Sequence, residues 1–349
     1  MKKILKNFFY RNKIQYHFLL SFLNNSKLYL ADVGATGGVS SNWDAINELM
    51  FYYTFDPDPR AKNKFVNNSL NFKSGLWSRK KKAILYQTKF PDASSIYEPN
   101  ESFLKYFKNH IDHKILDRIK INLTTLDEIL HNYTKPDFIK IDAEGADFDI
   151  LKGSTKILSD SCIGVQCETQ FSERNVGSPF FSDIDKFLRR KGFILFDINL
   201  ERWFRKEYFY SLDSKVQCIW GDSIFIIGID EIVKRVNDFN KVNKKIYLSK
   251  LILICISMKI YDYPVDVIKV FEEKKWITKD ESNKLILGIK KNIISTYKII
   301  MIEILFVFFN LFIFIFSFFY VPSINNSYKR FKRSLSNLLI LISKLINAY

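Results

Sequence analysis

A glycine turn after an apolar run is the first feature of this 349-residue sequence that could do chemistry. In DVGATGG, Gly34 and Gly37 let the backbone turn tightly and approach a ligand closely, because glycine has no side chain to fill the ligand's space. The dinucleotide fingerprint GxGxxG is not met. Asp32, before the first glycine, would repel a pyrophosphate but suits a ligand with a cationic amino group. The motif therefore favours S-adenosylmethionine over a nicotinamide dinucleotide.

A second acidic site, FDPDP, follows after about 20 residues, the spacing at which an acid meets the ribose in nucleotide-binding α/β folds. Asp56 is the first residue past an apolar run, and a carboxylate there can accept both hydrogen bonds of a ribose diol. Asp58 is predicted instead to cap a helix, because Pro59 follows it. Leu76, in the apolar run NFKSGLW, is the further residue that we assign to cofactor binding.

Carboxylates also follow two later apolar runs. Asp142 and Glu144 come at the end of DFIKID, where Gly145 permits a sharp exit, and Glu168 follows the run IGVQC. Carboxyl ends of parallel strands open on the same crevice, so these three side chains are expected to converge. Three carboxylates together could also hold a divalent cation, which prefers oxygen ligands. Metal dependence is therefore left open.

The elements that must position these residues alternate between short apolar runs and helical patterns from about Lys27 to Ile229. This rhythm is typical of βαβ units around a parallel sheet. We predict an α/β fold with a Rossmann-like, doubly wound, mostly parallel seven-stranded sheet and a helical C-terminal extension. The expected strands are 28–34, 51–56, 71–77, 137–142, 163–169, 194–199 and 223–229, with 83–90 as an antiparallel addition. Helical patterns cover WDAINELM, 100–117, TTLDEIL with Thr125 as its cap, and ADFDILKGSTKILS.

The whole constellation resembles the FkbM family of methyltransferases. The resemblance rests on DVGATGG, FDPDP, SSIYEPN, TTLDEIL, FIKIDAEGADFDILKG, CETQF, PFFSDIDKFLRRKGFILFDI and GDSIFI, which occur in that order. It does not extend over residues 231–349. It implies the class I methyltransferase fold, S-adenosylmethionine as the cofactor and, commonly, O-methylation of a sugar or other hydroxyl in a glycan or secondary metabolite.

Methyl transfer to a hydroxyl is an in-line displacement, in which the enzyme aligns the oxygen and helps to remove its proton. We therefore expect Asp142, Glu144 and Glu168 to be catalytic, with Glu168 as the general base. Asp142 could equally anchor the amino acid portion of the cofactor or its sulfonium, and Glu144 could be a helix N-terminal acid favoured by the dipole. Ser94 and Ser95 could contact cofactor or substrate, although small polar residues also make ordinary turns.

The charge balance would suit nucleic acid or an anionic membrane, since the net charge is +16. The basic residues are scattered, however, and accompany a bias toward Ile, Lys, Asn and Phe that an AT-rich genome would produce. No nucleic-acid module accompanies them, so we expect no nucleic-acid partner. The four cysteines form no CxxC pair, and Cys167 is predicted to be a buried hydrophobe. His110 and His113 are expected in an exposed helix without a catalytic role.

Four segments are predicted: a basic segment 1–25, the methyltransferase domain 26–230, a helical unit 231–300, and a hydrophobic, basic region 301–349. The run 304–321 carries no charge and approaches the length of about 20 residues that spans a bilayer. We expect this run and the basic tail to attach a cytoplasmic catalytic domain to the inner face of the cytoplasmic membrane. A buried helix of a soluble extension is the alternative.

These observations predict an S-adenosylmethionine-dependent O-methyltransferase acting on a sugar hydroxyl in a glycan, lipid-linked sugar or secondary metabolite, with a role in polysaccharide biosynthesis. A catalytically degenerate methyltransferase fold that serves as a membrane-anchored binding or scaffold module is the alternative. A nicotinamide-dependent oxidoreductase is a distant third. The acceptor is not predicted, because loops such as 171–182 and 200–220 carry no readable code.

Overall fold

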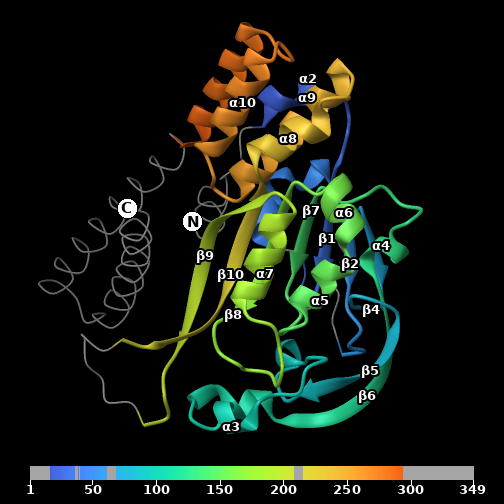
Figure 1. Ribbon diagram of the computed structural model, residues 1–349, viewed down its shortest axis with the longest axis vertical. Coiled ribbons are helices and arrows are strands. Elements are labelled where there is room, and N and C mark those ends of the chain that lie inside the picture. Colours follow the sequence, from blue (N-terminus) through green and yellow to red (C-terminus); the bar gives the residue numbers. More distant parts are fainter. Residues whose placement is uncertain (1–15, 36–37, 39, 61–67, 208–214, 294–349) are drawn as a thin grey trace, which may run out of the picture. The chain divides into compact units, whose positions relative to one another are not determined.

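A seven-stranded sheet forms the centre of the protein (Figure 1). The computed structural model describes residues 16–293 except 36–37, 39, 61–67 and 208–214. The strand order is β3-β2-β1-β7-β8-β10-β9. The strands are β1 (Leu28–Val33), β2 (Met50–Phe55), β3 (Ser69–Phe72), β7 (Phe138–Ile141), β8 (Gly164–Gln170), β9 (Phe193–Trp203) and β10 (Gln217–Ile227). The four pairings from β3 to β8 in this order are parallel, whereas β10 is antiparallel to both β8 and β9. The predicted mostly parallel seven-stranded α/β fold is confirmed.

Short helices connect the strands and cover the sheet. The helices α5 (Asp147–Lys152), α6 (Thr155–Asp160) and α7 (Phe181–Arg190) lie in front of the sheet in Figure 1. Between β1 and β2 the chain forms the 3-10 helix η2 (Ser41–Leu49), whose buried Trp43 packs edge-on against Phe138 with ring centroids 5.0 Å apart. Thr125 caps α4 (Leu126–Ile129) by accepting a hydrogen bond from the amide of Glu128, as its spacing predicts.

A second, three-stranded sheet lies beyond one end of the main sheet (Figure 1). It contains β4 (Gly75–Leu76), β5 (Lys81–Thr88) and β6 (Ile115–Thr124) in the order β4-β6-β5. The prediction of one strand over 71–77 is wrong, because β3 ends at Phe72 and the next two paired residues join this other sheet. The antiparallel direction of 83–90 is correct, since β5 runs antiparallel to β6.

Strand β6 corrects the prediction of helical turns through residue 117. The turns end earlier, with α3 (Glu101–Leu104) and the 3-10 helix η4 (Lys108–His113); a further 3-10 turn, η3, covers Pro91–Ala93. Most of the β6 side chains stay exposed or half-buried. The strand therefore lacks the strong apolar face by which strands are identified in a sequence.

Three C-terminal helices pack on the opposite end of the main sheet: α8 (Ile229–Val236), α9 (Lys241–Ser257) and α10 (Tyr263–Glu273) (Figure 1). Most of α9 is buried, and Lys250 forms an ion pair of 2.8 Å with Asp137 at the start of β7. Arg235 of α8 donates to the carbonyls of Leu158 and Cys162. Leu19–Ile277 form one compact unit, which thus includes these helices and α2 (Leu20–Leu23). The predicted boundary at residue 230 stays a prediction.

A second unit comprises Met1–Phe18 and Thr278–Tyr349, of which the structure describes residues 16–18 and 278–293. The short 3-10 turn η1 covers His17–Leu19. No helix within the described part of the chain is long and apolar enough to cross a membrane. The run 304–321, predicted to enter the membrane, and the basic tail lie outside the described residues.

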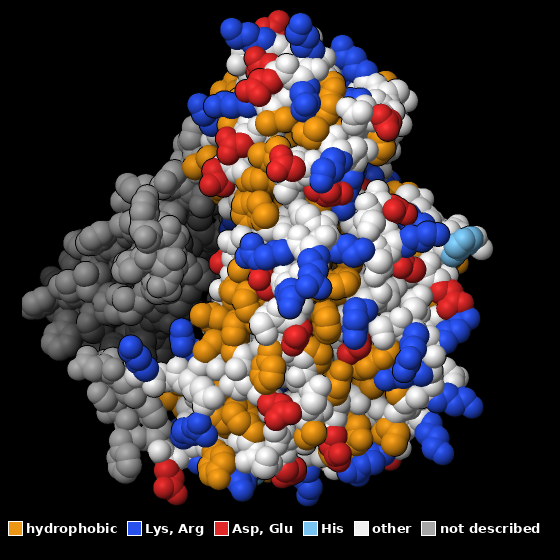
Figure 2. Space-filling model, viewed as in Figure 1, with side chains coloured by type: hydrophobic (Ala, Val, Ile, Leu, Met, Phe, Trp, Pro, Cys, Tyr) orange, Lys and Arg blue, Asp and Glu red, His pale blue; other side chains and the backbone are white. Residues whose placement is uncertain are grey.

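The surface of the described residues carries charges of both signs. On the face shown in Figure 2, Lys and Arg side chains are interspersed with Asp, Glu and hydrophobic side chains rather than gathered over one element. This distribution agrees with the scatter of basic residues along the sequence.

Candidate active site

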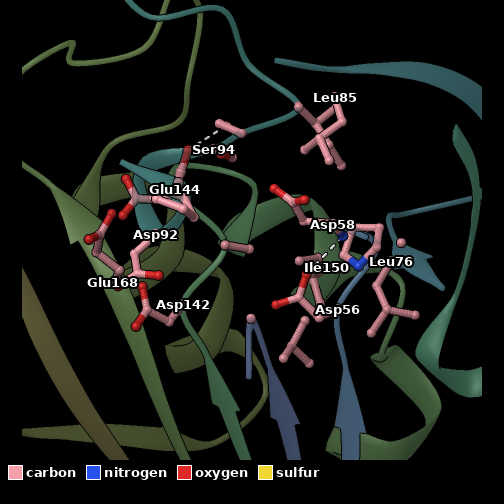
Figure 3. Close-up of a pocket in the computed structure, with 18 of the residues that line it drawn as sticks. Asp56, Asp58, Leu76, Leu85, Asp92, Ser94, Asp142, Glu144, Ile150 and Glu168 are labelled. Atoms are coloured by element: carbon pink, nitrogen blue, oxygen red, sulfur yellow. Dashed lines mark hydrogen bonds between the residues drawn. The ribbon is translucent and has the colours of Figure 1, made fainter. Parts of the chain in front are cut away.

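One pocket lies where β1, β2, β7 and β8 end, and it encloses about 980 Å³ including its open mouth. Its walls fall into two groups, which Figure 3 shows on opposite sides of the cavity. We call them the β1–β2 half, with Gly34, Asp56, Asp58 and Leu76, and the β7–β8 half, with Asp142, Glu144, Glu168 and Trp220.

Gly34 begins the β1–β2 half in a conformation that requires glycine. Its φ is +76°, and a Cβ atom there would lie 1.9 Å from the carbonyl oxygen of Asp142. The main chains after β1 and β7 therefore pass each other too closely for any side chain, and the bare backbone of Gly34 lines the pocket. Gly37, the other predicted glycine, lies outside the described residues.

Asp32 lies behind this turn rather than on the pocket wall. Its side chain is 2% exposed and lies 3.3 Å from the ammonium of Lys140 on β7. Burial raises the pKa of Asp32, while Lys140 lowers it. The same ammonium lies 3.3 Å from Asp142. Lys140 therefore joins the two strands electrostatically, a role that the sequence analysis missed. A lysine within the apolar run DFIKID was the available signal.

Asp56 and Asp58 follow β2 and differ in their partners. Asp56 is buried and accepts a hydrogen bond of 2.9 Å from the amide of Asp58. Asp58 pairs with Arg60 at 2.7 Å, and although burial raises the pKa of Asp58, hydrogen bonds from Arg60 lower it below its ordinary value. The segment that Asp58 was predicted to cap, 61–67, lies outside the described residues. Leu76 of β4 is 2% exposed and lines the same half.

The predicted carboxylates of the β7–β8 half do converge. One oxygen each of Asp142, Glu144 and Glu168 lies within 4.8 Å of the others. Asp142 is the most open of the three, with a side chain 43% exposed, whereas Glu144 and Glu168 are 13% and 3% exposed. Such an all-oxygen set suits a hard divalent cation.

Arg174 neutralises part of this cluster, and the sequence analysis did not identify it. Its buried guanidinium forms ion pairs with Glu144, at 2.6 Å, and with Glu168. Burial raises the pKa of Glu144 to about 7 against the opposing effect of Arg174, and burial likewise raises the pKa of Glu168. Two buried carboxylates thus share one cation, an arrangement that favours retention of a proton near neutral pH.

The turn after β7 holds these carboxylates in place at the cost of backbone strain. Glu144 has a φ of +51°, which is unusual for a residue other than glycine, and Gly145 follows with +97°. Ser95 donates a hydrogen bond of 2.7 Å to the carbonyl of Glu144. Asp147, the first residue of α5, accepts from the amides of Ala143 and Glu168. The acid at the N-terminus of α5 is therefore Asp147 and not Glu144, whose side chain pairs with Arg174.

Two histidines were expected on the surface, and this expectation is wrong for His113. Its side chain is 6% exposed and its ring lies 5.5 Å from that of Trp203. Burial and the nearby Arg174 lower the pKa of His113 to about 4. His110 is half-buried. Cys167 is buried as predicted, and burial raises the pKa of its thiol.

Part of the chain is similar to known methyltransferases. Residues 32–195 match the family model of the methyltransferase FkbM domain. No curated protein matches the chain. A crystal structure of methyltransferase FkbM from Methylobacillus flagellatus KT is similar at 12% identity over 58% of this chain and 44% of that chain, with a TM-score of 0.33. The chain thus spans less than half the length of that protein. The structure of an antibiotic-related methyltransferase matches at 14% identity over 60% of this chain and 92% of its own, with a TM-score of 0.25.

Proposed function

Because residues 32–195 match the methyltransferase FkbM domain, we propose that the chain is an S-adenosylmethionine-dependent O-methyltransferase. The proposed acceptor is a hydroxyl of a sugar in a glycan, a lipid-linked sugar or a secondary metabolite. One observation carries the proposal: a glycine turn with an acid after β2 faces a cluster of buried carboxylates across a single pocket. The first group suits a cofactor, and the second suits removal of a proton from an alcohol.

The β1–β2 half fits the proposed cofactor by the chemistry of its lining. Gly34 offers bare backbone, Asp56 a carboxylate for a ribose diol, and Leu76 an apolar surface. The acids around the pocket also suit a ligand that carries a sulfonium and an ammonium group. When bound, S-adenosylmethionine supplies an electrophilic methyl group.

The β7–β8 half would receive the acceptor's proton. A general base for an alcohol benefits from a pKa above that of an ordinary carboxylate, and burial raises the pKa of both Glu168 and Glu144. Glu168 shares Arg174 with Glu144. When either carboxylate takes up a proton, Arg174 can therefore keep its ion pair with the other. We assign the proton to the carboxylate of Glu168, with Arg174 fixing its position and Asp142 orienting the acceptor from the open side.

A divalent cation is the second way in which these carboxylates could activate a hydroxyl. Their oxygen atoms are close enough to share one ion, although Arg174 already pairs with two of them. Methyl transfer that is abolished by EDTA and restored by Mg²⁺ or Mn²⁺ would favour this mechanism over the direct one. Transfer that is indifferent to EDTA would leave the carboxylates as bases.

Glu168→Gln tests the catalytic assignment. Loss of the base is expected to lower the rate of methyl transfer by about 100-fold or more, because positioned acid–base groups contribute about 10²–10⁴-fold. The rate is followed as S-adenosylhomocysteine released in the presence of a panel of sugar acceptors. Titration calorimetry should show that the variant still binds S-adenosylmethionine. Glu48→Gln, at an exposed position of η2, is the matched control.

Two results would contradict the proposal. Wild-type protein that fails to bind S-adenosylmethionine would exclude the cofactor, and a Glu168→Gln variant as active as Glu48→Gln would exclude the base. Binding of cofactor without turnover on any acceptor would instead support a binding module on a methyltransferase fold.

Attachment to the inner face of the cytoplasmic membrane is also part of the proposal, and it rests on the apolar run 304–321 of the sequence. Carbonate extraction of membranes from cells that express the full chain tests it. Release of the chain into the supernatant would exclude a spanning segment.

A further inference from the structure

Trp220 occupies a distinctive position in the β7–β8 half. It lies on β10, two residues before Asp222, which is the neighbour of Glu168 across the β10–β8 pairing. Because alternate residues of a strand share a face, Trp220 and Asp222 lie on the same side of the sheet as Glu168. The β10–β9 register shifts between Cys218 and Trp220, and such bulges often redirect a side chain beside a functional site. The indole of Trp220 lines the pocket.

The protein holds the indole of Trp220 without using it for a hydrogen bond. The guanidinium of Arg174, fixed by Glu144 and Glu168, lies 5.7 Å from the centroid of the Trp220 ring. The Nε1 atom is buried, and none of the described residues accepts a hydrogen bond from it. A hydrogen bond therefore does not explain why a tryptophan stands here. Besides its contact with Arg174, the indole offers the pocket a flat ring surface.

The charge of the pocket limits which ligand can lie against this ring. Among the described residues, no Lys, Arg or His lines the pocket, although the whole chain carries a net charge of +16. The acids that line it are Asp56, Asp58, Asp92, Asp142, Glu144 and Glu168. Arg60, Lys140 and Arg174 do not line the pocket, but they pair with four of these acids. The six acids still outnumber these three cations, so a carboxylate or phosphate on the acceptor would meet an excess of negative charge.

From these observations we infer that Trp220 is the platform for the saturated ring of an uncharged sugar, and that the pocket rejects acidic or phosphorylated sugars. The inference rests on the proposed function and adds the class of acceptor to it. The C–H groups of a pyranose ring pack against the electron-rich face of an indole, while its hydroxyls meet the carboxylates of the same half. Trp220 is thus a specificity-determining residue that takes no part in proton transfer.

Ligand-observed saturation-transfer NMR on the full chain tests the subsite. The neutral probes are methyl α-glucopyranoside, methyl α-mannopyranoside and methyl α-rhamnopyranoside, and the anionic probes are glucuronate and glucose 6-phosphate. We expect wild type and Trp220→Phe to bind at least one neutral probe and neither anionic probe. Trp220→Leu should weaken the binding of that probe about fivefold to tenfold, as expected for loss of an aromatic contact. Trp276→Leu, at the end of α10, is the matched control.

Calorimetry with S-adenosylmethionine on the same samples separates this inference from the proposed function. Trp220→Leu should bind the cofactor as wild type does, which also shows that the variant folds. Wild type that binds cofactor but no pyranoside, equal binding of neutral and anionic probes, or an unchanged affinity in Trp220→Leu would each overturn the subsite. Wild type that binds neutral probes but no cofactor would overturn the proposed function and leave the ring subsite standing.

Discussion

The two halves of the pocket are built by different physical means. The β1–β2 half depends on main-chain geometry: Gly34 sits where a Cβ atom would meet the carbonyl of Asp142 at 1.9 Å. The β7–β8 half depends on buried charge: Arg174, itself 3% exposed, holds Glu144 and Glu168. Substitutions that add side-chain volume should therefore destabilise the β1–β2 half, and substitutions that remove a charge should destabilise the β7–β8 half.

This difference also separates binding from chemistry. A cofactor shared by many enzymes can be held by backbone and one acid, because its shape does not change from protein to protein. Proton removal needs a carboxylate whose pKa is raised, and burial beside other charges is the means of raising it.

Arg174→Met should have the largest effect, because it leaves two carboxylates buried without their cation. Removal of one partner from a buried ion pair costs about 3–5 kcal/mol. Urea unfolding at pH 8 should show a decrease of this size in the free energy of unfolding. The decrease should be smaller at pH 5, where the carboxylates can be neutralised by protons.

Arg118→Met is the matched control, since Arg118 pairs with Glu98 at 3.2 Å on the surface, where both side chains are about half exposed. Exposed pairs contribute about 0–1 kcal/mol. If the two variants lose the same stability, charge burial is not what holds the β7–β8 half together.

Sequence alone could predict the β1–β2 half because its determinants are local. Gly34 and Asp56 each stand directly after an apolar run. The same short stretch of sequence therefore predicts both where the strand ends and which residue lies at that end. The same logic placed Asp142 and Glu168 at one edge. Five of the seven strands of the main sheet are parallel, and four of them, β1, β2, β7 and β8, are short apolar runs that are mostly buried.

The parts that sequence could not predict depend on contacts between distant segments. Arg174 lies in a loop, and nothing in its neighbours indicates that it will be buried against Glu144. Strand β6 exposes most of its side chains, so its pattern was too weak to identify. His113 is covered by Trp203, 90 positions further along, a contact that no local pattern encodes.

Gly34→Ala tests the main-chain half. The added methyl group would overlap the Asp142 carbonyl and force a positive φ on alanine, so the free energy of unfolding should fall by about 3 kcal/mol. Binding of S-adenosylmethionine should be lost with it. Thermal and urea unfolding measure the first effect, and calorimetry the second.

Gly177→Ala separates the two causes, because Gly177 also has a positive φ, +71°, but nothing lies within 4 Å of a Cβ atom there. That variant should lose only about 1 kcal/mol from the backbone conformation. If both variants lose the same free energy of unfolding, the contact between the added methyl group and the Asp142 carbonyl does not contribute to the loss at Gly34.

Asp56→Asn should weaken S-adenosylmethionine binding by about tenfold to a hundredfold, because hydrogen bonds to a charged group contribute about 1.5–3 kcal/mol. Asparagine has nearly the same shape as aspartate, and its Oδ1 can still accept the hydrogen bond from the amide of Asp58, so the fold should persist. Calorimetry of the variant beside Asp160→Asn, an exposed aspartate of α6, measures the difference. Equal affinities would remove Asp56 from the cofactor site.

A pH dependence of the free energy of unfolding is expected from Glu144 in the β7–β8 half. Burial raises the pKa of Glu144 from near 4.5 to about 7, so its contribution to stability is present below 4.5 and is lost as the pH rises through 7. One titrating group changes the free energy of unfolding by at most about 1.4 kcal/mol per pH unit. Glu144→Gln should remove the share of the slope that comes from Glu144, so that wild type loses stability relative to the variant between pH 5 and 7, as measured by urea unfolding. Asp222, whose pKa burial raises to about 6, should keep its own share in both proteins. Glu98→Gln, on the surface, should keep the slope of wild type. Parallel curves for wild type and Glu144→Gln would show that Glu144 titrates in the folded protein as it does in the unfolded chain, and that Arg174 fully offsets its burial.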